Sequence, residues 1–160
     1  MAVTSQLSVF LASEAETQGF ASIMATVLQA PSRCYFKGEI GSGKTCFIRA
    51  LFKALGVTGA IKSPSYSIVE SYSFAQGLAH HFDLYRIHDE EELEFIGWRD
   101  YFEMSDAIVC LEWPERARHV LPIADLLLEL VQEGDGRRLI CKAYSVQGDA
   151  IIKRMSRVSD

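Results

Sequence analysis

The chain has 160 residues, of which 49% are hydrophobic and 23% charged, and its formal net charge is -5 at pH 7. A chain of this length can form one domain with a substantial core, and no apolar stretch approaches the roughly 18 residues that a membrane-spanning helix needs. The acidic balance argues against a large nucleic-acid surface, because such surfaces depend on clustered Lys and Arg, and it favours a protein partner over bare RNA.

The N-terminus and the cysteines indicate an intracellular protein. Residues 1–13 lack a basic segment followed by a continuous apolar run, so no secretory signal is visible. The cysteines have no C-x-x-C spacing and fall mostly in apolar runs, which favours reduced core thiols over zinc ligands or disulfides. We therefore expect a soluble, cytoplasmic protein that makes no membrane contact.

The first predicted elements are a strand and a helix. Apolar residues alternate over 7–11, as they do in a strand. Ser13 and Glu16 then form a capping box for a helix whose apolar face extends over residues 20–28. Pro31 ends this helix before the next strand.

A glycine-rich loop stands between the next strand and helix. Residues 34–36 are a short apolar run, typical of a buried strand, and residues 38–45 read GEIGSGKT, which matches the pattern G-x-x-x-x-G-K-[ST]. Apolar residues at three-and-four spacing over 47–55 predict a helix, with Gly56 as its stop. Strand, loop and helix thus occur in the order that a phosphate-binding loop requires.

The loop residues suit a triphosphate. Glycines let the backbone turn and aim N–H groups at phosphates, Lys44 reaches the outer phosphates, and the Thr45 hydroxyl can ligate magnesium. A plain glycine-rich turn would explain the glycines but not Lys44 followed by Thr45. The residues that we predict to bind the nucleotide are Gly38, Gly41, Ser42, Gly43, Lys44, Thr45 and Cys46.

Two strands and a helix are predicted next. Residues 62–74 and 78–85 read as strands around a turn at 75–77, which indicates an antiparallel hairpin. The acidic opening of residues 89–102 favours a helix start, because carboxylates complement the helix dipole.

The last predicted elements complete an α/β pattern. Residues 107–111 read as a buried strand stopped by Pro114, and residues 126–132 and 137–145 flank a turn as a second hairpin. We predict a P-loop NTPase-like, three-layer α/β domain whose mixed central sheet is extended by antiparallel hairpins and has helices on both faces. Residues 1–160 would form this single domain, and residues 147–160 could form a flexible C-terminal tail.

Two acids follow predicted strands. Asp83 ends the strand LAHHFD and Glu112 ends AIVCLE. Ligand crevices in open α/β sheets form beyond the carboxyl ends of strands, so both carboxylates could reach the phosphate site, hold magnesium and orient an attacking water. Spacing alone leaves open the alternative that they are exposed loop residues.

Beyond the loop, the chain carries KSPSY, HFDLYR, EELEFIG and LEWPE, in that order. With GEIGSGKT, these segments resemble the TsaE (also called YjeE) family, small bacterial ATPases of tRNA threonylcarbamoyladenosine synthesis. The resemblance spans about residues 17–138 and is far more specific than the loop alone. It implies ATP and Mg²⁺ as ligands, and ATP hydrolysis that is slow alone and stimulated by partners.

The resemblance also implies partners. Such proteins dock on TsaB and TsaD, which transfer a threonylcarbamoyl group from the adenylate made by TsaC to an adenosine beside the tRNA anticodon. Hydrolysis would reset that complex between turnovers. The chain would meet tRNA only through the complex.

The resemblance assigns roles to single residues. It places Lys44 and Thr45 at the phosphates and metal, Asp83 as an essential acid, and Glu112 as the acid near magnesium. On this basis we predict Asp83 and Glu112 as catalytic residues, and both, together with Thr45, as metal ligands. Arg86 completes HFDLYR and could serve either phosphate chemistry or a partner contact.

A switch-like segment and an aromatic residue also match the family. Ser63, Pro64 and Ser65 match a segment that could sense the nucleotide, although the family commonly has Thr in place of Ser65. The hydroxyl is retained but the stiffer β-branched side chain is lost. Trp113 and Pro114 match the family's EWP, although an aromatic residue after a buried strand is as often simple core.

Residues near the acids are less clear from the sequence. For His80, His81 and Tyr85 we expect ordinary strand packing rather than a role in the site. Gly136 and Arg137, in the last hairpin, could approach the nucleotide base.

Three other functions are compatible with a phosphate loop. A small-molecule kinase would need an acceptor pocket and an Arg-rich lid, and no such insertion is visible between the hairpins. A GTPase would need N-K-x-D, and the chain contains no asparagine. A noncatalytic, nucleotide-dependent binding module stays open, because slow hydrolysis leaves no separate signature in the residues.

Overall fold

The computed structural model describes residues 2–64 and 66–159, and within them seven strands form one mixed sheet in the order β1-β7-β6-β2-β5-β4-β3. The strands are β1 (Ser5–Leu11), β2 (Ser32–Lys37), β3 (Val69–Phe74), β4 (Gly77–Asp83), β5 (Ala107–Glu112), β6 (Leu126–Glu133) and β7 (Gly136–Ala143). The helices are α1 (Glu14–Val27), α2 (Lys44–Leu55), α3 (Glu91–Phe95), α4 (Trp98–Glu103) and α5 (Val146–Ser159), with a 3-10 helix η1 (Pro114–Ala117).

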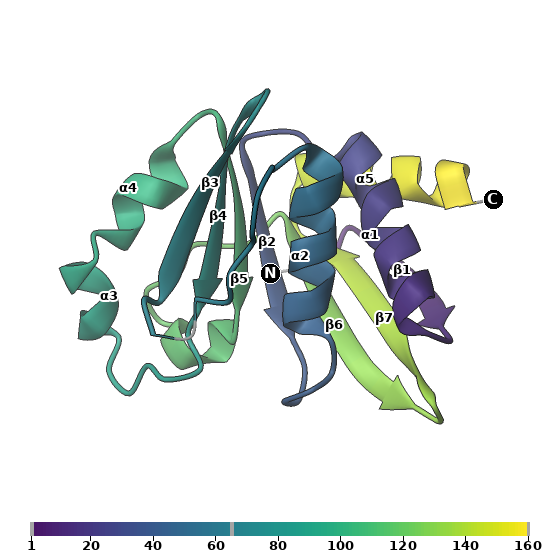
Figure 1. Ribbon diagram of the computed structural model, residues 1–160, viewed down its shortest axis with the longest axis horizontal. Coiled ribbons are helices and arrows are strands. Elements are labelled where there is room, and N and C mark those ends of the chain that lie inside the picture. Colours follow the sequence, from purple (N-terminus) through teal and green to yellow (C-terminus); the bar gives the residue numbers. More distant parts are fainter. Residues whose placement is uncertain (1, 65, 160) are drawn as a thin grey trace.

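The centre of the sheet is parallel and its edges are antiparallel. Strand β2 pairs in parallel with β5 and β6, and β5 pairs in parallel with β4. Strand β3 joins β4 as one antiparallel hairpin. At the other edge, β7 pairs antiparallel with β6, and β1 pairs antiparallel with β7. This confirms the predicted mixed sheet extended by hairpins. Figure 1 shows β2, β4 and β5 ending at the same lower edge, where the chain turns from β2 into α2.

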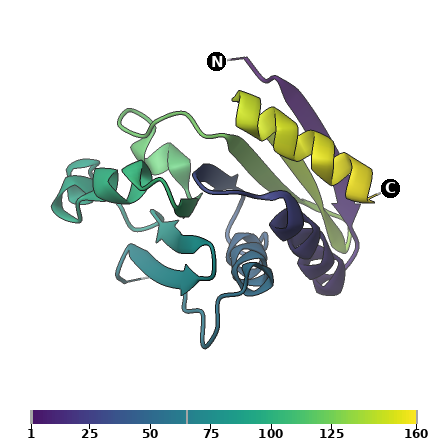
Figure 2. The same ribbon diagram turned by 90° about the horizontal axis from the view of Figure 1, so that it is seen from above.

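Helices cover both faces of the sheet. Along β2, Cys34 and Phe36 belong to a core with α1, α2 and α5, whereas Tyr35 belongs to a second core with α3, α4 and η1. This alternation follows from the period of two along a strand. Figure 2 shows α1 and α2 on the opposite side of the strands from α3 and α4. The predicted three-layer arrangement is confirmed.

Local sequence signals explain where α1 and α2 begin and end. The Ser13 side chain accepts a hydrogen bond from the backbone N–H of Glu16 at 3.2 Å, and the Glu16 carboxylate accepts one from the N–H of Ala12 at 3.1 Å. Helix α2 ends at Gly56, whose left-handed backbone (φ 106°) suits glycine. Both signals were legible in the sequence.

Two elements differ from their predictions. Strand β3 begins at Val69, whereas the sequence predicted a strand from residue 62; Pro64 lacks the backbone N–H that a ladder needs. The helix expected from residue 89 is two short helices, α3 and α4, separated at Gly97, which has a left-handed backbone (φ 66°). A glycine that interrupts an acidic, helix-favouring segment therefore decides its geometry.

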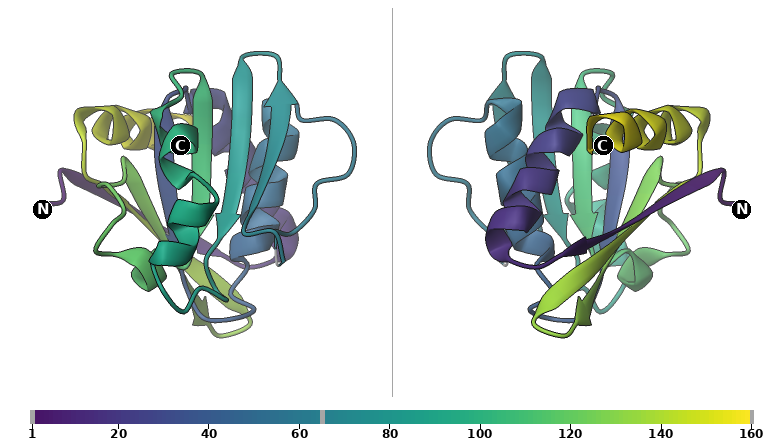
Figure 3. Two further views of the ribbon diagram at one scale, coloured as in Figure 1. Left: turned by 90° about the vertical axis from the view of Figure 1, so that its left-hand side faces the viewer. Right: turned by 90° about the vertical axis from the view of Figure 1, so that its right-hand side faces the viewer.

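The C-terminal segment is a helix and not the flexible tail that residues 147–160 could have formed. Helix α5 buries Ile151, Ile152 and Met155 against the core that it shares with α1. The right-hand view of Figure 3 shows α1 and α5 beside each other near the β1 edge of the sheet. The apolar residues of this short, basic segment have packing contacts only when the domain is folded. Among the described residues, no helix has the length and apolar character to cross a membrane.

Candidate functional site at the carboxyl ends of the central strands

The loop from Gly38 to Thr45 connects β2 to α2, and its shape depends on glycines. Gly43 has φ 104°, and a Cβ atom there would lie 1.9 Å from Nη1 of Arg137. A Cβ atom on Gly38 would lie 2.6 Å from the carbonyl oxygen of Leu130. The backbone contact excludes a larger residue at Gly38, since real Cβ contacts do not fall below about 3 Å, whereas at Gly43 the left-handed backbone disfavours one and the Arg137 side chain would have to move. The loop backbone therefore packs directly against β6 and β7.

The loop borders a cavity of about 420 Å³. The lining residues are Ile40, Gly41, Gly43, Lys44, Thr45 and Cys46 from the loop and α2, Asp83, Tyr85, Glu112 and Trp113 from the ends of β4 and β5, and Glu14 and Arg137. Gly38 and Ser42, also predicted to bind the nucleotide, instead line a neighbouring hollow. The fold thus gathers most of the predicted site residues in one cavity.

The ammonium group of Lys44 is held inside the site. Its Nζ donates hydrogen bonds to the carbonyl oxygens of Gly38 and Glu39 and lies 4.4 Å from the ring centroid of Trp113. Lys44 is only 4% exposed. Burial lowers the pKa of this lysine, and the nearby carboxylates of Glu112 and Asp83 act in the opposite direction. A buried cation next to a glycine-rich loop at a helix N-terminus is suited to an anionic ligand.

A buried carboxylate joins the loop to the strand ends. Oγ1 of Thr45 donates to the carboxylate of Glu112, at 2.9 Å from Oε2 and 3.0 Å from Oε1. Nε2 of His81 lies 2.6 Å from the same Oε2. Glu112 is 2% exposed, so its carboxylate has these hydrogen bonds in place of contacts with water.

The second acid lies beside the first. Asp83 and Glu112 are Cα partners at the ends of the parallel strands β4 and β5. Burial raises the pKa of Asp83; the backbone N–H of Tyr85, which donates to Oδ1 at 3.0 Å, lowers it, and the charge of Glu112 raises it. Parallel register therefore brings together the two acids that the sequence placed at separate strand ends.

The raised pKa of Asp83 leads to a stability prediction for Asp83→Asn. The folded state binds this proton more tightly than the unfolded chain, so stability falls as pH rises through the window between the two pKa values. At pH 7 the ionised carboxylate costs stability, and the amide oxygen can still accept from Tyr85. We expect Asp83→Asn to melt at a higher temperature than the wild type at pH 7, and the difference to vanish below about pH 3.9, the unfolded value.

Thermal unfolding at both pH values checks this prediction. Asp135→Asn, at an exposed hairpin position, is the control and should change stability by no more than about 0.5 kcal/mol. A lower melting temperature for Asp83→Asn at pH 7 would mean that the charged hydrogen bond to Tyr85 outweighs the cost of burial.

Tyr85 and Trp113 line one side of the cavity, and Arg116 packs on their rings outside the cavity lining. Trp113 has a left-handed backbone (φ 62°), and its N–H donates to the carbonyl oxygen of Phe36. Its ring lies 5.1 Å from that of Tyr85 and 5.8 Å from the guanidinium carbon of Arg116. The strained backbone turns this indole toward Lys44, so Trp113 is part of the site and not simple core.

The structure distinguishes residues that pack in the strand layer from residues that belong to the site, which the sequence could not do. His80 does pack in the strand layer, as expected, but His81 contacts Glu112, and Tyr85 lines the cavity. The signal that could have found His81 is the period of two along β4, which puts it on the same face as Asp83. Sequence reasoning missed this because both histidines occupy one apolar strand.

The remaining candidates lie in different places. Nη1 of Arg137 donates to the carbonyl oxygen of Ser42 at 2.7 Å, inside the loop, whereas Gly136 packs against the backbone of Leu11 and does not line the cavity. The guanidinium of Arg86 lies 4.8 Å from the Tyr66 ring, outside the cavity lining. The switch-like segment is described only in part.

Ser65 of that segment lies outside the described residues. Ser63 and Pro64 do not line the cavity, and the carbonyl oxygen of Pro64 accepts from the N–H of Ile68.

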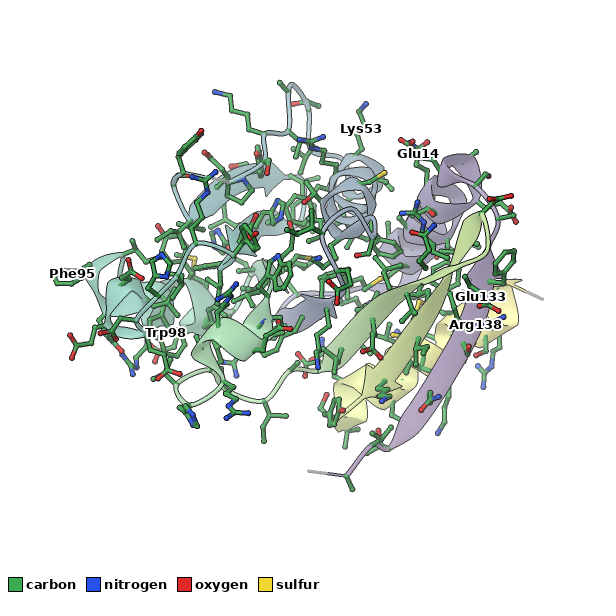
Figure 4. The ribbon with its side chains drawn as sticks, turned by 90° about the horizontal axis from the view of Figure 1, so that it is seen from below. Glu14, Lys53, Phe95, Trp98, Glu133 and Arg138 are labelled. Carbon is green, nitrogen blue, oxygen red and sulfur yellow. The ribbon has the colours of Figure 1, made fainter. Side chains whose placement is uncertain are left out.

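A second groove adjoins the site along the helices. It measures about 700 Å³, runs between α1 and α2, and shares Glu14 and Cys46 with the cavity. Figure 4, seen from below, shows Glu14 and Lys53 on the same side of the molecule, whereas Phe95 projects from the α3 end. The loop cavity and this groove therefore meet at Glu14 and Cys46.

Comparisons with known proteins show the family of the chain. Residues 11–140 match the family model described as "Threonylcarbamoyl adenosine biosynthesis protein TsaE". The chain is similar to the TsaE proteins of Haemophilus influenzae (42% identity; 76% of this chain and 77% of the relative) and Aquifex aeolicus (34%; 82% and 92%). Both relatives carry the name "tRNA threonylcarbamoyladenosine biosynthesis protein TsaE".

A solved structure has the same architecture. The crystal structure of Bacillus subtilis YdiB superposes with a TM-score of 0.85 and covers 100% of this chain and 99% of its own, at 22% identity. This likeness supports the P-loop NTPase-like α/β fold predicted from the sequence.

Proposed function

The chain belongs to the TsaE family of tRNA threonylcarbamoyladenosine biosynthesis, and we propose that it serves this pathway by binding and hydrolysing ATP. One observation carries the proposal: Lys44, Thr45 and Glu112 meet in one cavity at the carboxyl ends of parallel strands. Phosphate sites form at such strand ends, where the N-terminus of the following helix adds partial positive charge.

The donor atoms of the site fit a magnesium ion. Mg²⁺ prefers hard oxygen ligands, and the Thr45 hydroxyl and the carboxylates of Glu112 and Asp83 supply them on three neighbouring elements. When bound, the ion would offset the negative charge that develops on the transferred phosphoryl group. Among the lining side chains, sulfur comes from Cys46, whose thiol pKa is raised by burial, and nitrogen comes from Lys44, Trp113 and Arg137, which are not ligands that Mg²⁺ prefers.

Each residue of the site then has a distinct role. Successive N–H groups of the loop bind phosphate oxygens, and Lys44 exchanges its bonds to two loop carbonyls for the outer phosphates. Asp83 and Glu112 would orient the attacking water and would hold the metal. The indole of Trp113 covers the ammonium group and limits its access to water.

We further propose that the chain docks on TsaB and TsaD in a nucleotide-dependent way and that ATP hydrolysis serves this docking. What supports this is family membership together with a nucleotide cavity whose rim includes the exposed aromatic and arginine residues around Tyr85. TsaC would act upstream, and tRNA would be reached only through the complex, in the cytoplasm.

The ATPase rate measured with and without TsaB and TsaD tests the function. We expect slow hydrolysis by the chain alone and faster hydrolysis with both partners. ATP binding without any hydrolysis in either condition would favour the noncatalytic binding module. Absence of ATP binding would refute the proposal altogether.

Docking is tested by titrating the TsaB–TsaD complex with the apo, ADP and ATP forms. A nucleotide can shift docking only if it binds the docked and free states with different affinity. We expect the forms to differ by a coupling of roughly 1 to 3 kcal/mol. Equal affinities would remove the switch while leaving the ATPase proposal standing.

Tryptophan fluorescence provides a direct measure of ATP binding. Trp113 borders the cavity and contacts Lys44, whereas the chain's other tryptophan, Trp98, is 4% exposed in the second core. ATP should alter the environment of Trp113 alone. We expect Trp113→Phe to abolish the emission change on ATP addition and Trp98→Phe to preserve it; the reverse pattern would place the nucleotide elsewhere.

A further inference from the structure

His81 is the buried polar group of the site to which no role has been given. It lies on β4 with no exposed surface, and its Nε2 is 2.6 Å from Oε2 of Glu112. An ionised carboxylate only accepts hydrogen bonds, so Nε2 must carry the proton and donate. Nδ1 of the ring has no hydrogen-bond partner among the described residues. The single polar contact of this imidazole is therefore the site carboxylate.

The side chains packed around His81 restrain the orientation of its ring. Phe52 of α2 stands edge-on to the imidazole, with ring centroids 6.2 Å apart and an interplanar angle of 81°. A ring that is closed off by the core cannot turn to water or to another acceptor. The Glu112 carboxylate therefore has hydrogen-bonding partners on two sides, His81 on β4 and the Thr45 hydroxyl on α2.

We propose that His81 is a positioning residue that holds the Glu112 carboxylate against the Thr45 hydroxyl. The inference rests on the proposed ATPase function and concerns how its acid is kept in place. Without the His81 donor, only the Thr45 hydroxyl would restrain the Glu112 carboxylate, and Oε2 would no longer be fixed against it. A buried carboxylate that lacks a donor turns toward other partners, such as Lys44, whose Nζ lies in the same cavity.

The chain supplies a matched control in the preceding residue. His80 is also buried on β4, but it faces the opposite side of the sheet. Its Nδ1 lies 2.8 Å from Oγ of Ser71, and its ring packs edge-on against Tyr101 at 4.9 Å. Changes at His80 thus test the general cost of altering a buried histidine in this strand.

Two amide substitutions at position 81 test whether a hydrogen-bond donor is needed at the place of Nε2 or whether any polar side chain is enough. The nitrogen of a Gln side chain can take the place of Nε2, whereas the shorter Asn side chain places its nitrogen near Nδ1. We expect His81→Asn to lower kcat, and to raise the Mg²⁺ concentration for half-maximal ATPase, by about 10- to 100-fold, the usual range for partners of metal ligands. His81→Gln should return kcat and the Mg²⁺ concentration for half-maximal ATPase most of the way to their wild-type values. Neither variant should change ATP affinity measured in EDTA.

The controls distinguish failure of this inference from failure of the function. His80→Asn and His80→Gln should retain wild-type kcat and Mg²⁺ dependence, whatever they do to the melting temperature. If the wild type hydrolyses ATP and His81→Asn matches it in kcat and Mg²⁺ dependence, the positioning role is wrong and the ATPase stands. A wild type without ATPase refutes the proposed function instead.

A measurement on the intact protein covers the case in which both His81 variants fail to fold. Nitrogen-15 NMR of the imidazoles should show a proton on Nε2 of His81. Glu112→Gln should shift the His81 signals and leave those of His80 in place. A His81 ring protonated at Nδ1 alone would overturn the inference.

Discussion

Lys44→Ala should reduce ATP turnover by about 100- to 1,000-fold or more, which is the usual cost of removing one preorganised contact to developing charge. The ammonium group is buried at the cavity, and no other lysine lines it. The fold should survive, because burial lowers the pKa of this lysine and its charge is therefore held at a cost. Steady-state ATPase assays and thermal unfolding of the same samples give the two readouts.

Lys53→Ala is the matched control for this change. Lys53 lies on the same helix α2 but is exposed in its last turn. Its removal should alter stability by no more than roughly 0.5 kcal/mol and leave turnover intact. Near-normal ATPase in Lys44→Ala would show that GEIGSGKT is not the phosphate-binding loop of an ATPase.

Glu112→Gln should abolish hydrolysis while ATP still binds. The amide has the shape of the carboxylate, its oxygen can accept from His81, and its NH₂ group can donate to Thr45. What is lost is the charge that holds the metal and orients the water, so we expect a loss of at least about 100-fold in turnover. ATP affinity by fluorescence titration and turnover by phosphate release separate the two effects.

Glu115→Gln is the control for an acid near the site. Glu115 is exposed on η1, does not line the cavity and should retain wild-type turnover. Wild-type turnover in Glu112→Gln would make Glu112 a structural residue. Loss of ATP binding would make it a binding residue instead of a residue needed for the chemical step.

The sequence predicted the parts of the fold that depend on local chemistry. The capping box at Ser13, the helix stop at Gly56 and the strand–loop–helix order around Lys44 each rest on residues close together in the chain. Where local signals compete, the prediction failed. Gly97 divides a segment whose acidic residues favour one helix, and β3 begins after Pro64 instead of at residue 62, where the predicted strand started.

The sequence by itself determined the phosphate loop and the two strand-end acids, because a backbone turn and a strand end are local features. Only the tertiary structure decided which residues meet there. Parallel pairing of β4 with β5 sets Asp83 beside Glu112, and the face of β4 separates His81 from His80. Such contacts depend on register between strands that are distant in the chain, and burial then raises or lowers the pKa of the groups that register brings together.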